Sequence, residues 1–300
     1  MSRSTPPGLP LKAMMDLKKH RFLLDKLLQE ALKEDLGQKD ITTDLLIPRG
    51  HISRGVILLK ETATLCGLDI AKRVFRKLDP HLDFQALRKD GDEVWAHTVI
   101  VRLRGKTRAI LSAERVALNF LGYLSGIATK TRAFVKKVYP YKAVILDTRK
   151  TIPTLRWLQR FAVRCGGGHN HRFSLDQMVL IKDNHLTALG SVDLARVIER
   201  IRSQSSKPIE VEVTNLPQYQ KALEAQPDMI LLDNMTMGEV KKALAMARTL
   251  KKTKRPLLEA SGGIDLANVR QVAKTGVARI SVGALTHSLR SIDMSLELWK

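Results

Sequence analysis

The chain has 300 residues, 44% of them hydrophobic and 27% charged, which is enough to bury a substantial core in one large α/β domain or two smaller ones. No apolar run approaches the ~20 residues that a membrane span requires, and two cysteines cannot form a disulfide framework, so we expect a cytoplasmic protein and not a membrane protein. The 51 Lys and Arg against 30 Asp and Glu give a net charge of +21, which makes nucleic acid or an acidic surface a candidate partner.

The chain begins with a basic leader, residues 1–20, that lacks the continuous apolar core and the small-residue cleavage site of a secretory signal. We expect this leader to be disordered. Arg21–Leu36 is predicted to be an amphipathic helix, because leucines recur on or near one of its faces. These leucines are Leu23, Leu24, Leu27, Leu28 and Leu32.

The following residues, up to about position 140, show no regular alternation of strands and helices. Strand-like pieces occur at Ser53–Leu59, Thr64–Leu68 and Thr98–Leu103, and Ser112 is a candidate N-cap for a helix that carries Ala117 and its apolar neighbours. We interpret this half as an α+β domain with a mixed or antiparallel sheet.

From about Ala143 onward, short apolar runs alternate with amphipathic stretches, a pattern typical of parallel strands covered by helices. Six such strands without a Rossmann glycine fingerprint favour a (β/α) barrel, which can be incomplete. The predicted strands are Ala143–Asp147, Met178–Asp183, Ile209–Val213, Met229–Asp233, Leu257–Ser261 and Ala278–Gly283. The predicted helices between them include Leu216–Ala225, Gly238–Leu250 and Leu266–Thr275.

Polar and charged residues stand at the carboxyl end of almost every predicted strand, where a parallel barrel places its active site. Strands often end in polar residues for structural reasons alone, but a barrel without a site would not repeat ionisable groups at these positions. The groups are Asp147 to Lys150, Lys182 to His185, Glu212, Asp233 with Asn234, Ser261 to Gly263, and Gly283.

The residues at these strand ends and in the adjoining loops differ in the ligand groups that they can bind. Arg149 and Arg172 can grip carboxylates or phosphates bidentately, and lysines supply compact charges for phosphate oxygens. Glu212 and Asp233 suit ribose hydroxyls, Mg²⁺ or a cationic transition state, and the glycine-containing loops can present backbone N–H groups to a phosphate. The set therefore predicts a site for an anionic acid and a phosphorylated sugar with a divalent metal.

A transition-metal site is the competing interpretation of this region. His169 and His171 follow Cys165 closely, but the spacing matches no closed zinc pattern and a second cysteine partner is missing. The glycine triplet that precedes His169 is a weak phosphate signal, more typical of a tight turn. We expect Cys165 to be a small buried residue and not a nucleophile.

A series of ordered motifs covers nearly the whole chain after the leader: EDLGQKDITTDLLIP, SAERVALNFLGYLSGIAT, DTRKTIPTLR, GGGHNHR, LIKDNH, VEVTN, ILLDNM, EASGGI and SVGALTHS. Together they resemble the quinolinate phosphoribosyltransferases, also called nicotinate-nucleotide pyrophosphorylases (carboxylating). The resemblance implies an α/β sandwich domain (residues 21–126), to which a C-terminal helix (287–300) can pack back, and an incomplete α/β barrel (127–286). It also implies assembly at least as a homodimer.

The reaction implied by the resemblance joins quinolinate to 5-phosphoribosyl 1-diphosphate with Mg²⁺, releasing pyrophosphate and CO₂ and forming nicotinate mononucleotide for NAD biosynthesis. Lys150, Lys182, Glu212 and Asp233 are the implied catalytic residues, the last two also serving, directly or indirectly, as metal ligands. Arg115 is similar to an arginine that this family donates from a neighbouring subunit. The implied substrate-binding residues are Arg115, Thr148, Arg149, Lys150, His171, Arg172, Lys182, Glu212, Asp233, Ser261, Gly262, Gly263, Ser281, Val282 and Gly283.

The chain departs from the family pattern at a few loop positions. KTIPTLR replaces the usual KTTPGLR, which puts Ile152 and Thr154 in place of Thr and Gly, and Ser174 replaces a common Gly. We expect these changes to affect loop shape and not charge.

Two rival functions stay open at this point. A phosphoribosyltransferase-like protein of molybdenum-transport operons shares the TRKT and GGG segments, although the complete LIKDNH motif favours the quinolinate enzyme. A barrel-derived nucleic-acid binder is the alternative from another class, motivated by the charge of +21. Basic runs such as residues 251–255 are, however, more typical of solvated surfaces than of binding sites.

Overall fold

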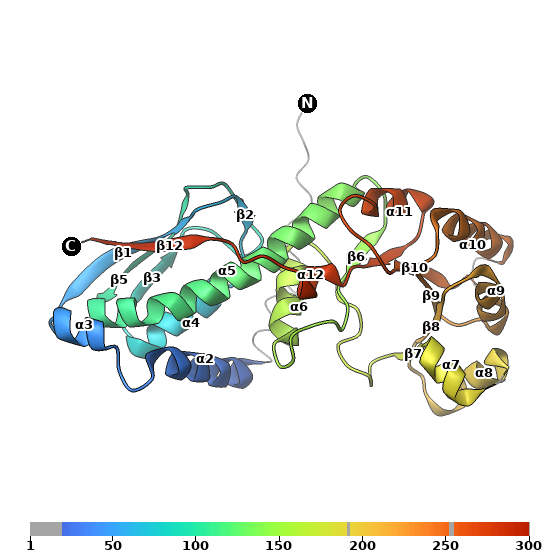
Figure 1. Cartoon of the computed structure of the whole chain (residues 1–300), viewed down its shortest axis with the longest axis horizontal. Helices are drawn as coiled ribbons and strands as arrows, with labels where there is room; N and C mark the ends of the chain where they lie inside the picture. Colours follow the sequence, from blue (N-terminus) through green and yellow to red (C-terminus); the bar gives the residue numbers. More distant parts are fainter. Residues whose placement is uncertain (1–19, 191–192, 252–254, 300) are drawn as a thin grey trace. The chain divides into compact units, whose positions relative to one another are not determined.

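The computed structural model describes residues 20–190, 193–251 and 255–299, which form two compact units (Figure 1). Of the described residues, the first unit contains 20–132, 157–167 and 289–299, and the second contains the rest. The predicted leader, apart from its last residue, lies outside the described residues. None of the described helices is both long enough and apolar enough to cross a membrane.

The first unit is built on a four-stranded antiparallel sheet, which is one of the two arrangements, mixed or antiparallel, predicted for it. Along its strand β1, buried and more exposed residues alternate, because one face packs on helices. The strands, in sheet order, are β12 (Met294–Trp299), β1 (Ile52–Leu59), β5 (Val99–Lys106) and β3 (Asp83–Ala86). A separate pair joins β2 (Ala63–Thr64) to β4 (Glu93–Val94). The helices are α2 (Arg21–Leu36), α3 (Ile41–Leu46), α4 (Leu68–Leu78), α5 (Thr107–Val138) and α6 (Arg156–Cys165).

Three predictions for this half were wrong. The expected C-terminal helix is strand β12, whose MSLELW sequence alternates with period two and pairs with β1 from Leu59↔Met294 to Arg54↔Trp299. Ser112 does not cap a helix, because α5 already begins at Thr107, and its hydroxyl donates to Asp40 instead (2.9 Å).

Of the predicted strand Thr64–Leu68, only Thr64 lies in a strand (β2), and residues 65–67 have no regular secondary structure. Gly67 adopts φ +108°, and α4 starts directly after it, at Leu68.

Helices α5 and α6 also differ from the predicted domain limits. Residues 157–167, which contain all of α6 except its first residue Arg156, belong to the first unit although the chain on both sides belongs to the second, and the end of α5 from Ala133 onward belongs to the second unit. A Cβ at Gly166, which follows α6, would lie 2.5 Å from the carbonyl oxygen of Ala128 on α5. The glycine therefore allows the end of α6 to approach α5 this closely.

The second unit is a parallel sheet of six strands in the order β6-β11-β10-β9-β8-β7. Each predicted strand is present: β6 (Val144–Leu146), β7 (Val179–Ile181), β8 (Ile209–Val213), β9 (Met229–Asp233), β10 (Leu257–Ser261) and β11 (Arg279–Ser281). In the described part of the chain, β6 and β7 form the two edges and do not pair with each other, which confirms the incomplete barrel.

The helices of the second unit connect the strands, and Figure 1 shows α9, α10 and α11 along the outer side of β8 to β10. Parallel strands require such crossover connections, and the helices cover apolar strands that would otherwise face water. The helices are α7 (Asp183–Leu189), α8 (Leu194–Gln204), α9 (Leu216–Ala225), α10 (Met237–Thr249), α11 (Val269–Thr275) and α12 (Ala284–His287).

Candidate active site

A cavity of about 880 Å³ opens at the carboxyl ends of the parallel strands. It is lined by all but two of the residues predicted for the site: Thr148, Arg149, Lys150, His171, Arg172, Lys182, Glu212, Asp233, Ser261, Gly262, Gly263, Ser281 and Gly283. Arg115 lies on α5 of the first unit, and Val282 is buried next to Ser281. The lining also includes residues that were not predicted: Leu180, Leu231, Asn234, Glu259, Ile264, Asp265, Ala284 and His287.

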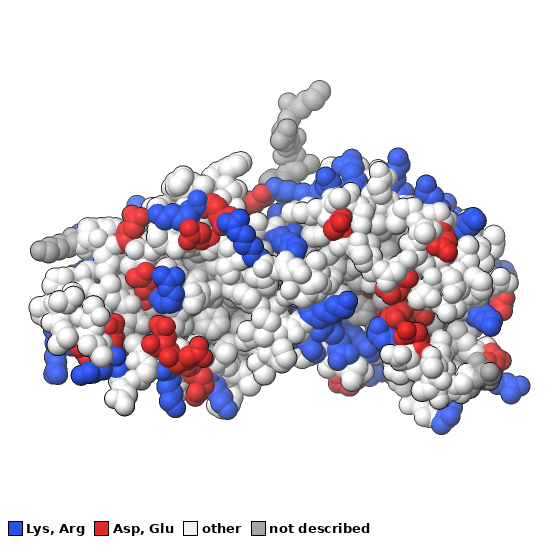
Figure 2. Space-filling model, viewed as in Figure 1, with Lys and Arg blue, Asp and Glu red and all other residues white. Residues whose placement is uncertain are grey.

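The arginines and most of the carboxylates of the cavity come from different elements, although Lys182 is paired with Glu212. The arginines come from two loops, one after β6 (the β6 loop, residues 147–155) and one before β7 (the His171 loop, residues 168–178). The carboxylates come from β8, β9 and β10. Figure 2 shows a group of basic side chains beside a group of acidic ones on the second unit. The cavity can therefore hold a molecule, or a pair of molecules, with anionic and polyhydroxylated parts.

Hydrogen bonds fix the backbone of Lys150 and the side chain of Arg172. The hydroxyl of Thr286 donates to the carbonyl of Lys150 (2.7 Å), and the hydroxyl of Thr148 accepts the Lys150 N–H (3.1 Å). Arg172 donates through Nη1 to the carbonyl of Met178 (2.9 Å). Burial and, second, the charge of Arg149 lower the pKa of Arg172, so the two guanidinium groups repel each other across the cavity.

Asp147, at the end of β6, ties the His171 loop to the sheet. Its carboxylate is fully buried and accepts hydrogen bonds from the His171 N–H (2.7 Å) and from the Asn170 side chain (2.6 Å). Charge-assisted bonds of this kind are the strong ones in proteins. Asp147 thus fixes where the loop places His171 and Arg172.

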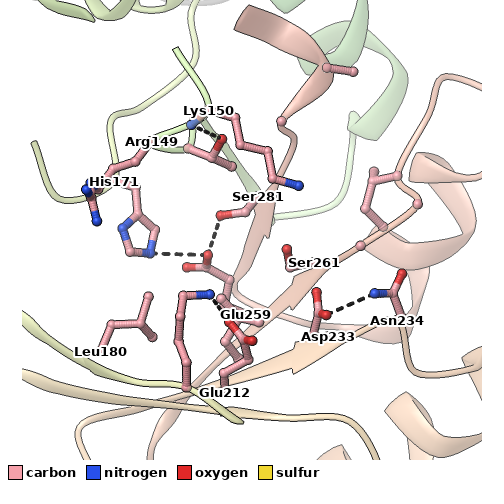
Figure 3. A pocket seen from close by; sticks show the side chains of 18 of the residues that line it. Arg149, Lys150, His171, Leu180, Glu212, Asp233, Asn234, Glu259, Ser261 and Ser281 are labelled. Atoms are coloured by element: carbon pink, nitrogen blue, oxygen red, sulfur yellow. Dashed lines mark hydrogen bonds and ion pairs between the residues drawn. The ribbon is translucent and has the colours of Figure 1, made fainter. Parts of the chain in front are cut away.

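His171 contacts two buried carboxylates from different strands, and Figure 3 shows one of them, Glu259, beside its ring. Its Nε2 is 3.1 Å from Glu210 on β8 and 3.4 Å from Glu259 on β10, and both glutamates are fully buried. Glu259 also accepts from the Ser281 hydroxyl and pairs with Arg279 Nε (2.7 Å).

The two neighbouring carboxylates determine the protonation of His171. Burial opposes a charged ring, but the hydrogen bonds and charges of Glu210 and Glu259 raise the pKa of His171 to about 9. The Arg172 N–H donates to Nδ1 (2.8 Å), which requires a lone pair there and so opposes protonation of that nitrogen. We place a proton on Nε2, which faces the carboxylates.

Glu212 and Asp233 form the acidic side of the cavity (Figure 3). The Lys182 ammonium is paired with Glu212, and Asp233 accepts from the Asn234 side chain (2.9 Å). Both carboxylates line the cavity from the ends of neighbouring strands.

The two glycines after β10 are required by geometry. Gly262 has φ +85° and Gly263 has φ +57°, which a residue with a side chain adopts only with strain. A Cβ at Gly262 would also lie 2.3 Å from Oδ1 of Asn234. The backbone here can consequently lie close to a ligand, as the phosphate-loop prediction requires.

Of the residues weighed for a transition-metal site, Cys165 and His171 lie in two different clusters, and His169 is in neither of them. The Cys165 thiol lies with Cys66 and Asp90, all within 4.8 Å, and both cysteines are buried and free. His171 instead lies with Glu210 and Glu259.

Comparison with known proteins decides the family. Residues 127–297 match the quinolinate phosphoribosyl transferase C-terminal domain, and residues 40–125 match its N-terminal domain. The chain belongs to the quinolinate phosphoribosyltransferase family. This membership confirms the activity predicted from the motifs, quinolinate phosphoribosyl transfer in NAD biosynthesis.

Individual relatives span nearly the whole chain. A probable nicotinate-nucleotide pyrophosphorylase (carboxylating) of Methanocaldococcus jannaschii is 43% identical over 91% of this chain and 96% of its own. The Mycobacterium leprae enzyme of the same name is 40% identical over 90% and 95%. The solved structure of the nicotinate-nucleotide pyrophosphorylase from Francisella tularensis superimposes with a TM-score of 0.84 at 40% identity, covering 92% of this chain and 96% of that one. The Ehrlichia chaffeensis protein gives 0.84 at 37%, covering 91% and 98%.

Sequence reasoning missed the roles of Asp147, Glu210 and Glu259. A signal for the glutamates was present, because each interrupts a strand that otherwise reads as buried and apolar, IEVEV and LLEAS. A carboxylate at such a position needs a cationic or hydrogen-bonding partner. The partner, His171, comes from a distant loop that the strand pattern does not reveal.

Proposed function

We propose that this cavity binds quinolinate on its arginine side and 5-phosphoribosyl 1-diphosphate on its acidic, glycine-rich side. The quinolinate nitrogen displaces pyrophosphate from the ribose, and loss of CO₂ from the C2 carboxylate gives nicotinate mononucleotide. The observation that carries the proposal is the division of one cavity between two guanidinium groups and a carboxylate pair next to glycine loops. Both substrates are anionic, but only the phosphoribosyl donor has hydroxyls that carboxylates can bind.

In this arrangement Arg149 and Arg172 bind the two carboxylates of quinolinate, since guanidinium groups match carboxylates bidentately. His171 borders the same subsite. Its ring nitrogens already face the Arg172 N–H and the buried glutamates, so we propose that His171 forms part of the wall of that subsite and contributes its charge there.

Lys150 and Lys182 lie against the pyrophosphate and the pyridine ring. Glu212 and Asp233 bind ribose hydroxyls and stabilise the positive charge that develops on the sugar as its bond to pyrophosphate breaks. The backbone of the two glycine loops binds the 5-phosphate. These loops contain Ser261, Gly262, Gly263, Ser281, Val282 and Gly283.

Loss of the C2 carboxylate leaves an electron pair on C2, next to the positively charged ring nitrogen, and a proton then adds there. The C2 carboxylate leaves more readily when water is excluded from it. The partly buried Arg172 supports such exclusion, because its guanidinium is held by the Met178 carbonyl at the cavity wall.

Mg²⁺ is the proposed metal, and the residues present fit it. Mg²⁺ binds through one or two carboxylates together with substrate phosphates, and Glu212 and Asp233 provide a pair of carboxylates at neighbouring strand ends. When bound, Mg²⁺ would neutralise the charge on the departing pyrophosphate. Lys182, already paired with Glu212, adds a positive charge in the same place.

We also propose a homodimer or larger homo-oligomer with shared sites, acting in the cytoplasm. Arg115 is exposed on α5 and is not among the residues that line the cavity of the second unit, which supports its use by another subunit. Mixing Arg115→Ala with Lys182→Ala protomers tests this directly. Hybrid sites free of both substitutions should restore activity, and a mixture as inactive as its components contradicts sharing.

The reaction itself is tested by incubating the protein with quinolinate, 5-phosphoribosyl 1-diphosphate and Mg²⁺ and measuring nicotinate mononucleotide. Product that disappears when the metal is chelated supports the proposal. Absence of product over a range of pH and metals contradicts it. Tight, salt-sensitive DNA binding that quinolinate does not affect would favour the nucleic-acid binder instead.

A further inference from the structure

Arg156, the first residue of α6, contacts both loops that carry the quinolinate-binding arginines. Its Nε donates to the hydroxyl oxygen of Thr151 in the β6 loop (2.9 Å), and its Nη1 donates to the carbonyl of Phe173 in the His171 loop (2.9 Å). The guanidinium also lies over the Phe173 ring, 5.8 Å from its centroid. Arg156 itself is absent from the cavity lining.

Each residue that Arg156 contacts is connected directly to a substrate-binding arginine, either by a hydrogen bond or along the chain. The Thr151 hydroxyl, which accepts from Arg156, donates in turn to the carbonyl of Arg149 (3.3 Å). Phe173 directly follows Arg172 in the chain. One planar guanidinium therefore fixes the backbone at Arg149 on one side and at Arg172 on the other, which a point charge such as an ammonium cannot do with the same geometry.

The two loops need such a connection. Burial and, second, the charge of Arg149 lower the pKa of Arg172, so the two guanidinium groups repel each other, and the charge of Glu210 opposes this effect. Thr154, between Thr151 and Arg156, has φ +67°, an unfavourable conformation for a β-branched residue. The β6 loop is thus held in a conformation that it would not prefer by itself.

We propose that Arg156 is a positioning residue that sets the spacing of Arg149 and Arg172 for a dicarboxylate. The proposal rests on the proposed function, since it assumes that these two arginines bind quinolinate. Loss of the Arg156 contacts should weaken quinolinate binding more than binding of the phosphoribosyl donor, because the glycine loops and carboxylates that receive the donor lie on other strands and only Lys150 of the β6 loop faces its pyrophosphate.

The test measures the Kd of quinolinate and, separately, the Kd of 5-phosphoribosyl 1-diphosphate for Arg156→Ala, Arg156→Lys and Thr151→Val. Misplacement of a binding group typically costs tenfold or more. We expect Arg156→Ala to raise the quinolinate Kd at least about tenfold, the other two variants to raise it less, and the Kd of the phosphoribosyl donor to rise by a clearly smaller factor than that of quinolinate in each variant. Added guanidinium should restore part of the affinity of Arg156→Ala.

Arg196→Ala is the matched control, because Arg196 belongs to the same unit, its side chain is 86% exposed, and it lies outside the cavity. It should bind both substrates normally and gain nothing from guanidinium. If Arg156→Ala fails to fold, Thr151→Val and Arg156→Lys carry the test.

A double-mutant cycle separates positioning from general damage. In an Arg149→Ala background, Arg156→Ala should cost less than it does alone, since part of what it positions is gone. Equal weakening of both substrates, or normal quinolinate binding in the Arg156 and Thr151 variants, would overturn the proposal. Normal binding in Arg149→Ala and Arg172→Ala would instead contradict the proposed function.

Discussion

Glu259→Gln should destabilise the second unit substantially, although it changes only an oxygen to an NH₂ group. Glu259 is fully buried, and it contacts Arg279, His171 and Ser281. Burial opposes its ionised form, but the hydrogen bond and charge of His171, followed by the charge of Arg279, lower the pKa of Glu259. The native carboxylate is therefore charged, and the substitution removes that charge from a buried cluster.

The magnitude follows from the exposure of the partners. Removing one member of a buried ion pair costs about 3–5 kcal/mol, because the other charge stays buried without compensation. The Arg279 side chain is 20% exposed and that of His171 is 7% exposed, so water can compensate only part of the loss. We expect a decrease of about 3 kcal/mol in the free energy of unfolding.

The assay must observe the second unit. All three tryptophans, Trp95, Trp157 and Trp299, belong to the first unit, so their fluorescence reports that unit alone. Amide hydrogen exchange in β8 to β10, read by mass spectrometry, measures the second unit directly.

The matched control is Glu224→Gln on α9 of the same unit, where the carboxylate is exposed and accepts a hydrogen bond from the Gln220 side chain (3.3 Å). An exposed polar contact of this kind contributes less than about 1 kcal/mol. If Glu259→Gln costs no more than Glu224→Gln, the buried cluster does not stabilise the second unit electrostatically.

The remaining predictions concern the site, the pH dependence, the cysteines and the β6 loop. Arg149→Ala and Arg172→Ala should each lower kcat/KM in steady-state assays by an amount equivalent to a loss of at least about 2 kcal/mol of transition-state stabilisation, since each removes charge-assisted hydrogen bonds. Near-normal kinetics in both variants would show that the assignment of the two arginines is wrong. His171 has a raised pKa of about 9 in the folded protein, so its contribution to stability is complete below pH 6.5 and is lost as the pH rises toward 9. Unfolding free energies from pH 6 to 10 should therefore fall less steeply in His171→Asn than in the parent protein, and parallel curves would exclude this role. Cys66 and Cys165 are fully buried, and burial, together with the neighbouring Cys165, raises the pKa of the Cys66 thiol. Neither cysteine should therefore react with a thiol reagent until the protein unfolds. Rapid labelling of the native protein would contradict their burial. Thr154→Gly should stabilise the β6 loop by up to about 1 kcal/mol by relieving the positive φ, and slower hydrogen exchange in that loop would show it, whereas faster exchange would refute the strain.

The parallel sheet was predictable because its strands are buried on both faces and therefore read as short apolar runs. Three of the six strands, β6, β7 and β11, are shorter than the predicted runs at both ends. The antiparallel unit was harder to predict. Strand β12 depends on pairing with β1, which lies more than 230 residues earlier in the chain, and period-two alternation over six residues does not identify such a partner.

The site was predictable to the extent that its residues stand at strand ends. Arg149, Lys182 and Asp233 were found because position in the strand and chemistry agree. Glu210 and Arg156 were missed, because their importance comes from which loops they contact, and loop conformation follows from tertiary contacts more than from local sequence.

A crystal structure with quinolinate bound tests the central claim most directly. We predict that the two carboxylates of quinolinate contact Arg149 and Arg172, with the ring nitrogen facing Glu212 and Asp233, where the ribose would bind. Quinolinate held by other residues, or with its nitrogen turned away from those carboxylates, would contradict this assignment of the cavity.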